Sequence, residues 1–478
     1  MRKTLALFLA LMITLLSLYS LTFTAVNKEK DNVVISEKYI YGDKAYAENT
    51  DINFKAQYSE NLLWDIKYDI ATGETDADFS IYKDRIPREY EYDNELRLYS
   101  TFYYNHLDGK DSTPINRAYN ELAKTATPYE MAIKVINLSD YYEYYPITID
   151  VSFKNFNYDS SFNTPRQTAE TELEKAISDF FRIPVDKNDK MQINLITDEN
   201  GNITQTGTAT ATEDGIYDTF DFYAHSISTD DECFIYFGNK TEQGRIADTS
   251  EIPGGYGIYS LPYTNTGTNV IFTTEDIKNI FPLDESESVY KLQLSADKKE
   301  LYMMSNIGNK NYLTVIDVEN YTEKSKISVT DIKETSSNID YIGEDFIVIT
   351  HYHPYLDSKI SVYTTDGKGG FDEKFTVDQY ITDESEKDAV HYAGGDFYLN
   401  GNEIDVKWDG ERLYVTNATG DNSPIIREGN FKLSIYDKNG VLFCGEYKTS
   451  LTTGYDGYQA SGYYIGISNY DLIEIILS

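Results

Sequence analysis

Histidine is the first residue type to examine for chemistry, because the chain of 478 residues contains only five. His351 and His353 stand two apart at the end of an apolar run. In a strand, both side chains would project from one face, as two ligands of a metal ion do. No third ligand follows in the sequence, and a histidine pair at the edge of a loop explains the spacing without a metal. We therefore keep His351 and His353 only as metal candidates that lack a third ligand.

Known catalytic motifs are absent from the sequence. It contains no H-E-x-x-H, no G-x-S-x-G, no phosphate-binding loop and no dinucleotide fingerprint. Acidic side chains are plentiful, but no pair stands out as the two carboxylates of a glycosidase. The turn 198–202 has calcium-like residue types, yet its spacing misses the EF-hand pattern and turn chemistry explains it. We predict no catalytic residue and no cofactor, apart from non-specific attraction of Ca²⁺.

The charge of the chain restricts its partners. Lysine and arginine number 42 against 79 aspartates and glutamates, which gives a net charge of −37. Binding to a phosphate backbone needs a basic face, so nucleic acid is excluded as a partner. The same charge disfavours an anionic membrane surface. The 44 tyrosines favour a β-rich protein, because tyrosine suits half-buried strand positions.

The N-terminus has the pattern of an export segment. Arg2 and Lys3 precede an apolar run from Thr4 to Val26, and such a run spans roughly 34 Å as a helix. We favour an uncleaved signal anchor over 1–26, with the bulk of the chain outside the cytoplasm at the cell membrane. Cleavage would instead make the protein secreted. Residues 27–50 are polar, and we expect them to form an extracytoplasmic tether.

Cys233 and Cys444, the only cysteines, both lie in apolar strand-like stretches. Two buried thiols acting as small apolar side chains explain them, and a single disulfide is the alternative.

Residues 51–206 predict a β-rich region with one helix. Alternating stretches indicate half-buried strands, and 191–206 is typical of a hairpin. The helix is expected over 168–181, where Leu173, Ile177, Phe180 and Phe181 form one apolar stripe. The tyrosine-rich stretch 141–145 fits either packing within the fold or stacking on sugar rings.

A repeat appears from residue 207 to the C-terminus. Each unit has a polar turn, a buried strand, a loop and a second hairpin, and we place the buried strands near Cys233, Leu301, Phe346 and Leu413. The interval from Leu301 to Phe346 suits one four-stranded propeller blade, whereas the neighbouring intervals are longer and must contain insertions. A final strand pair is expected between Tyr463 and Leu477, where it would close a ring against earlier strands.

At this point the repeat resembles a known family. Tyr414-Val415-Thr416-Asn417, together with the stretch 312–317, is similar to the β-propeller repeats named for the Tyr-Val-Thr-Asn motif, which are related in shape to WD-repeat propellers. Only one copy has the full motif, and the spacing is uneven. The resemblance implies a mainly β chain whose C-terminal domain, 207–478, is a β-propeller of about six to seven blades. The region 51–206 would contribute strands to it.

Three loops follow the buried strands, at 305–311, 351–358 and 417–430, and loops of this kind carry function. Our leading interpretation is a membrane-anchored propeller that binds a protein or cell-envelope glycan without catalysis. The alternatives are a secreted polysaccharide hydrolase or lyase and an architectural envelope protein. The candidate ligand-binding residues are Asn306, Asn309, His351, His353, Tyr355, Asn417 and Asp421.

Overall fold

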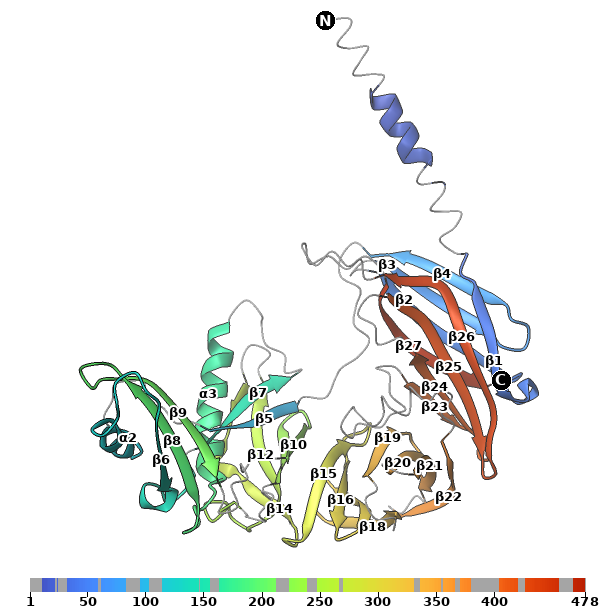
Figure 1. Cartoon of the computed structure of the whole chain (residues 1–478). Helices are drawn as coiled ribbons and strands as arrows, with labels where there is room; N and C mark the ends of the chain where they lie inside the picture. Colours follow the sequence, from blue (N-terminus) through green and yellow to red (C-terminus); the bar gives the residue numbers. More distant parts are fainter. Residues whose placement is uncertain are drawn as a thin grey trace, which may run out of the picture. The chain divides into compact units, whose positions relative to one another are not determined.

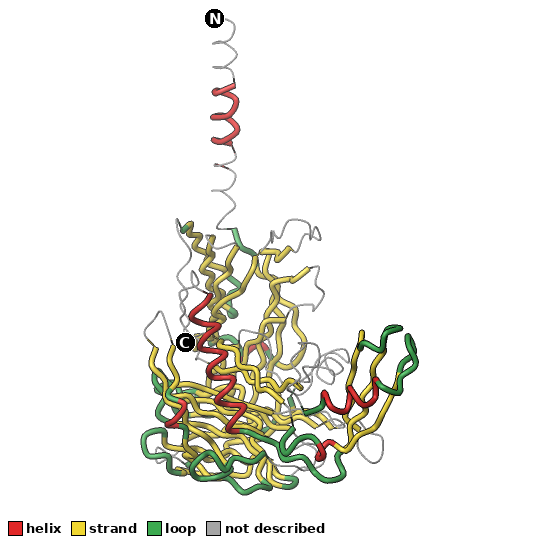
Figure 2. The backbone as a smooth tube through the Cα atoms, turned by 90° about the vertical axis from the view of Figure 1, so that its left-hand side faces the viewer, coloured by secondary structure: helices red, strands yellow, loops and turns green. Residues whose placement is uncertain are grey.

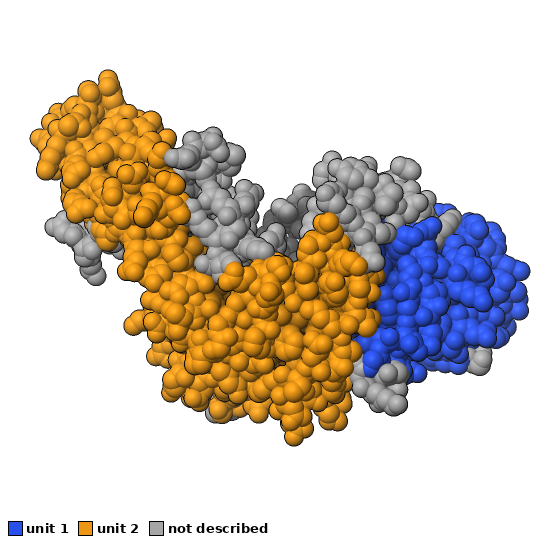
Figure 3. All heavy atoms as spheres, turned by 90° about the horizontal axis from the view of Figure 1, so that it is seen from below, with its two compact units in different colours: residues 1–90, 332–478 blue, residues 91–331 orange. Residues whose placement is uncertain are grey.

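The computed structural model describes residues 11–21, 24, 32–58, 62–82, 95–102, 114–145, 147–154, 163–211, 223–238, 247–265, 270–330, 336–353, 356–365, 370–379, 404–419, 426–454 and 467–477. Strands predominate among them (Figure 2). The chain forms two compact units, drawn in blue and orange in Figure 3. Unit 1 comprises residues 1–90 and 332–478, and unit 2 comprises residues 91–331.

Unit 1 contains three antiparallel sheets that pack in series. The first follows chain order through β19 (Ser336–Ile342), β20 (Phe346–His353), β21 (Leu356–Thr365) and β22 (Phe371–Asp378). The second runs through β23 (Ile404–Trp408), β24 (Leu413–Thr419), β25 (Ile426–Asp437) and β26 (Gly440–Gly454). The third contains β2 (Thr50–Tyr58), β3 (Leu62–Asp69) and β4 (Thr75–Ile81).

The first and the last described strands of the chain complete sheets of unit 1 (Figure 1). β1 (Ile35–Gly42) pairs antiparallel with β26, and the short 3₁₀ helix η1 (Lys44–Tyr46) follows it. β27 (Ile467–Leu477) pairs antiparallel with β2. The expected pairing of the C-terminus with earlier strands is therefore present, although the described part is one long strand. The tether expected over 27–50 differs from the structure from Ile35 onward, because half-buried alternation in β1 matches the edge of β26.

Unit 2 contains two further sheets in chain order. One has β10 (Tyr223–Ser228), β11 (Glu232–Gly238) and β12 (Gly257–Asn265), and β12 also pairs with β13 (Val270–Phe272) and β14 (Lys278–Pro282). The 3₁₀ helix η3 (Thr274–Asp276) lies between β13 and β14. The other runs through β15 (Glu287–Leu294), β16 (Glu300–Ile307), β17 (Lys310–Asp317) and β18 (Glu323–Thr330).

The remainder of unit 2 combines helices with short sheets. β5 (Glu95–Phe102) pairs with β7 (Ile147–Lys154), and β8 (Lys190–Thr197) lies between β6 (Ala132–Asn137) and β9 (Ile203–Ala211). The helices are α2 (Asn116–Ala123), α3 (Asn163–Phe180) and the 3₁₀ helix η2 (Leu138–Asp140). The expected helix and the expected 191–206 hairpin are both confirmed, with α3 starting five residues earlier.

Each buried strand of the repeat is the second strand of its sheet, and it is apolar because both of its faces are covered. In β11, Cys233, Ile235 and Phe237 pack in the core beneath α3, whereas Phe234 and Tyr236 pack with Leu301 and Met303 of β16. β24 behaves in the same way in unit 1: Leu413 and Val415 pack on the β19–β22 sheet and Tyr414 packs on the opposite side. An almost continuous apolar run is the expected pattern for a strand buried on both faces.

The long intervals in the repeat have structural explanations. Between Cys233 and Leu301 lie β13, η3 and the segment 247–256. Between Phe346 and Leu413, residues 380–403 lie outside the described part of the chain. The described residues form five sheets of four or five strands, against the six to seven blades expected. The boundary expected at 206/207 also differs from the units, because β1 pairs with β26 and β2 pairs with β27, which joins the first strands of the chain to the C-terminal ones.

The described part of the N-terminal apolar segment, residues 11–21 and 24, is helical, and its large apolar side chains are exposed. Among the residues described, no helix has the length and apolarity needed to cross a bilayer.

Burial of Ile475 tests the role of the C-terminal strand. Ile475 of β27 is 1% exposed and packs in the core shared by the β23–β26 and β2–β4 sheets, whereas Ile81 at the end of β4 is 72% exposed. We expect Ile475→Ala to lower the free energy of unfolding by about 2–4 kcal/mol, because the deleted methylenes leave a cavity. Ile81→Ala, measured in the same urea titration, should change it by less than about 0.5 kcal/mol. Equal effects of the two substitutions would contradict the placement of β27.

The two cysteines give a second test. Cys233 lies in unit 2 and Cys444 in unit 1, both are fully buried and both are free thiols. Burial raises the pKa of Cys233 to about 12, so its reactive thiolate is scarce. We expect no reaction of the native protein with a thiol reagent such as DTNB and two thiols per chain after denaturation. A denatured chain without free thiols would establish the disulfide instead.

Candidate functional site

The first predicted loop, 305–311, is the tight hairpin between β16 and β17. Ile307 pairs with Lys310, so Gly308 and Asn309 alone form the turn. Gly308 has a φ of +66°, as the first central residue of a type II′ turn requires. The Asn306 amide donates to Asn311 Oδ1 at 2.9 Å, and Asn309 is exposed. Of these two candidates, Asn309 is the one presented to solvent.

The other two predicted loops lie in unit 1, and each connects the second and third strands of its sheet. His351 pairs with Lys359 and His353 with Leu356 across the β20–β21 hairpin. Asn417 of β24 pairs with Lys432 of β25. Tyr355, Asp421 and the side chains of His353 and Asn417 lie outside the described part. The loop 305–311 belongs to unit 2, and the other two loops belong to two different sheets of unit 1.

His351 has an interior role instead of an exposed one. Its ring is 5% exposed, its Nδ1 lies 2.8 Å from Ser337 Oγ and its Nε2 lies 2.8 Å from Ser361 Oγ. Ser361 Oγ is hydrogen-bonded to Thr376 Oγ1 at 2.6 Å, and Thr376 Oγ1 donates to the Glu373 carboxylate at 2.8 Å. This hydrogen-bonded chain crosses all four strands of the β19–β22 sheet. Both ring nitrogens are used within the fold, so His351 does not serve as a metal ligand in this arrangement.

A similar polar line crosses the β15–β18 sheet of unit 2. Glu287 of β15 is 4% exposed and accepts from Ser305 Oγ of β16 at 2.6 Å. Lys326 Nζ of β18 donates to its two carboxylate oxygens at 2.8 and 2.9 Å. Tyr256, which directly precedes β12 of the neighbouring sheet, donates to the Glu287 carbonyl at 2.9 Å. The buried carboxylate is thereby fully compensated, as a buried charge must be.

In the β23–β26 sheet, too, a polar side chain of the second strand is hydrogen-bonded to the first strand. Thr416 Oγ1 of β24 donates to the carbonyl of Asp405 in β23 at 3.3 Å. The Asp405 carboxylate accepts the backbone N–H of Ile475 in β27 at 2.6 Å and lies 3.5 Å from Lys407 Nζ. Burial raises the pKa of Asp405. Its side chain therefore fastens β27 to β23.

These interior polar residues could have been found in the sequence. Ser305, His351 and Thr416 each follow an apolar run and lie at the start of a predicted loop or directly before it. A polar residue at a buried strand position needs a partner. The partners Glu287 and Ser337 lie on the preceding strand, and no local pattern marks them.

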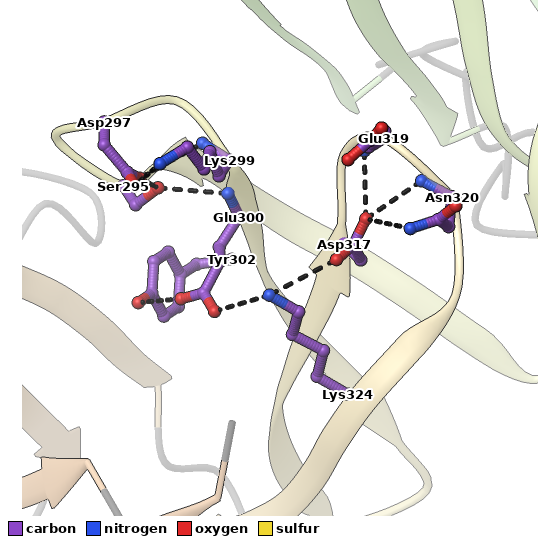
Figure 4. Close-up of polar contacts among 9 residues, drawn as sticks. All are labelled: Ser295, Asp297, Lys299, Glu300, Tyr302, Asp317, Glu319, Asn320 and Lys324. Carbon is purple, nitrogen blue, oxygen red and sulfur yellow. Dashed lines mark hydrogen bonds and ion pairs between the residues drawn. The ribbon is translucent and has the colours of Figure 1, made fainter. Parts of the chain in front are cut away.

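At the opposite end of the β15–β18 sheet, polar side chains bond to one another and to the backbone of the turns (Figure 4). Lys324 Nζ bridges Glu300 at 2.9 Å and Asp317 at 3.3 Å, and Tyr302 donates to Glu300 at 2.9 Å. Asp317 also accepts the backbone N–H groups of Glu319 and Asn320 at 3.0 and 2.9 Å. These bonds lower the pKa of Asp317. The acids here stabilise turns, and their carboxylates are already engaged.

A glycoside hydrolase needs one carboxyl group with a raised pKa beside a second, ionised one. Among the described acids with a resolved shift, the pKa is raised only at Asp405, whose partners are a backbone N–H and a lysine. No group of three potential metal-ligating side chains occurs among the described residues.

The tyrosines of 141–145 support packing. The Arg117 guanidinium lies 5.0 Å from the ring centre of Tyr141, and the Arg182 guanidinium lies 4.6 Å from that of Tyr144. Tyr145 is buried and donates to Asp189 at 2.5 Å. One face of the Tyr141 ring and one face of the Tyr144 ring are thus occupied by an arginine of the same chain.

No family model matches the chain, and no curated protein matches it in sequence. Among solved structures it is similar to a protein from Bacteroides fragilis that carries the provisional name 6-phosphogluconolactonase, at 9% identity and a TM-score of 0.29, over 89% of this chain and 98% of that one. TolB from Acinetobacter baumannii matches at 9% identity and a TM-score of 0.22, over 85% and 81%. The Dos1 propeller matches at 12% identity and a TM-score of 0.23, over 54% and 62%. TM-scores this low carry no argument about what the chain does.

His351 predicts a pH dependence of stability. Burial, together with the nearby Lys359 ammonium, lowers the pKa of His351 from 6.5 to about 4. Folding therefore favours the neutral ring. This contribution is complete above pH 6.5 and is lost as the pH falls towards 4, and it amounts to about 3 kcal/mol. Urea unfolding at pH 7 and pH 4 should show a loss of stability that is larger by about this amount in the native sequence than in His351→Gln. Parallel losses would show that His351 titrates normally.

Proposed function

We propose that this chain is a recognition protein built on a β-propeller scaffold, which binds a protein or cell-envelope ligand through its second-strand turns and performs no catalysis. The observation that carries the proposal is the repeated sheet. Meandering antiparallel sheets that follow one another in the chain pack face to face, with an apolar second strand between neighbours. In a propeller each blade covers the next in this way, and equivalent turns gather at one end.

The side chains at these turns support recognition over chemistry. Polar residues at the strand ends, such as Glu287, Ser305 and His351, are engaged in bonds within their own sheets. What the hairpin at 305–311 offers to a ligand is its exposed tip at Asn309. A rigid scaffold with exposed turns is the usual basis of a binding surface.

The place of action is a second part of the proposal. Arg2, Lys3 and the apolar run to Val26 support export and anchoring in the cell membrane, with cleavage giving a secreted form. Only eight residues separate Val26 from Ile35 of β1, so the tether would span less than about 30 Å. An anchored chain would hold its unit 1 close to the membrane.

Capture of a partner from the envelope fraction of the source cells tests the binding surface. Asn309→Lys and Thr322→Lys each place one cation in an exposed turn at opposite ends of the β15–β18 sheet. Asn309→Lys should reduce capture at least about tenfold, and Thr322→Lys should leave it unchanged. Protein and glycan must both be recorded. Unaltered capture by Asn309→Lys would remove this turn from the binding surface, and depolymerisation of a captured glycan would favour the hydrolase.

A further inference from the structure

A second surface of unit 2 lies far in sequence from the repeat turns. β6 is the edge strand of the β6–β8–β9 sheet, and within the described part of the chain its one neighbouring strand is β8. An edge strand presents a row of backbone N–H and C=O groups that can pair with another chain. Proteins usually protect such edges with a covering element, a proline or an outward charge.

The same unit protects the edge of β7 directly. Ser178 and Glu174 of α3 accept the backbone N–H groups of Ile149 and Val151 at 2.9 and 3.2 Å. β6 has no comparable charge on its outer side. Its lysine, Lys134, points to the other face and reaches Glu121 of α2 at 3.3 Å.

Two of the three outward positions of β6, Ile133 and Val135, are apolar, and the third is Asn137. Ile133 and Val135 are 54% and 55% exposed, and Met131, at the alternate position before the strand, is 61% exposed. Tyr129, which lies in the preceding turn with a φ of +63°, is 69% exposed. We call these four residues the β6 strip. Ile136, on the opposite face, is buried in the core of unit 2. Met131, Ile133 and Val135 of the strip combine the alternation of a half-buried strand with the exposure of a surface, which is typical of an interface.

Acidic residues mark one end of the β6 strip. The backbone N–H of Tyr129 donates to the Thr197 carbonyl at 2.8 Å, which brings the β8–β9 turn with Asp198 and Glu199 to this end. Glu130 and Glu199 are exposed. A basic residue on a partner would complement them.

We propose that the β6 strip and the free edge of β6 form a docking site for an extended segment of another protein, which adds as a strand beside β6. Alternate apolar side chains of that segment would cover Ile133 and Val135, and a lysine or arginine would lie near Glu130 and Glu199. Main-chain bonds give affinity in this mode and alternate side chains give specificity. The site is separate from the turns in the proposed function, so either can fail without the other.

Other occupants fit less well. A second copy of the chain carries the same net charge of −37 and the same acidic end, so approach of two copies is opposed by repulsion. A lipid surface would cover the apolar side chains but would leave the edge N–H and C=O groups unpaired in an apolar medium, which is costly.

The test uses the full chain and a fluorescent synthetic peptide of about nine residues that alternates valine and threonine and ends in two lysines. Anisotropy should report saturable binding, weakened at least about tenfold by Ile133→Lys. Ile81→Lys is the matched control, because Ile81 is also an exposed isoleucine at the end of an edge strand, in unit 1. Val135→Thr keeps the strand propensity and removes only apolar contact, so it should weaken binding even if Ile133→Lys disturbs folding.

The outcomes separate clearly. Absence of peptide binding, or equal affinity of the native chain, Ile133→Lys and Val135→Thr, would overturn the proposal. Equal affinity for a peptide that ends in two glutamates would overturn the assignment of the acidic end. Sedimentation that shows a dimer of the native chain, lost in Ile133→Lys, would establish a second copy as the occupant and overturn the proposed heterologous partner.

Discussion

Burial of one apolar strand between two sheets is the constraint on which the rest of the structure depends. β11 divides its side chains between the α3 core and the β15–β18 sheet, and β24 divides them between its two neighbouring sheets. Neither face of such a strand can be left uncovered without exposing several large apolar side chains. The sheets that contain β11 and β24 therefore need a neighbour on both sides. Buried polar residues at strand ends must find partners within the sheet, as His351 and Glu287 do.

The local elements could be predicted from the sequence, because alternation and apolar runs are local signals. The helix near 168–181, the hairpin at 191–206 and the buried strands of the repeat all appear where expected. The polar composition of 27–50 predicts a tether, whereas β1 forms there because it pairs with β26. That partner lies some four hundred positions later, and no window of sequence reveals it. His351 illustrates the same difficulty at the site: its spacing from His353 suggests a ligand, whereas Ser337 and Ser361 on adjacent strands decide its role.

The acidic residues have two roles in the structure. Many aspartates and glutamates are engaged at turns, as Asp317 and Glu300 are with Lys324, and these contribute to local order. The remaining excess gives the surface a long-range repulsion for other acidic molecules. A recognition protein with this surface would select ligands that are neutral or basic, and short-range contacts at exposed turns and edges would then decide among them.

The pairing of the two chain ends also has a consequence for biosynthesis. β1 and β2 emerge first, yet their partners β26 and β27 lie at the C-terminus, and the Val34 N–H bonds Ser450 across 416 residues. Contacts of such sequence separation form slowly, because the entropy of closing the loop must be met before they are rewarded. During synthesis, one edge of β1 and one edge of β2 would stay unpaired until the C-terminal strands are made. A chain truncated anywhere in its final strands would leave an open template for aggregation and an easy substrate for quality-control proteases.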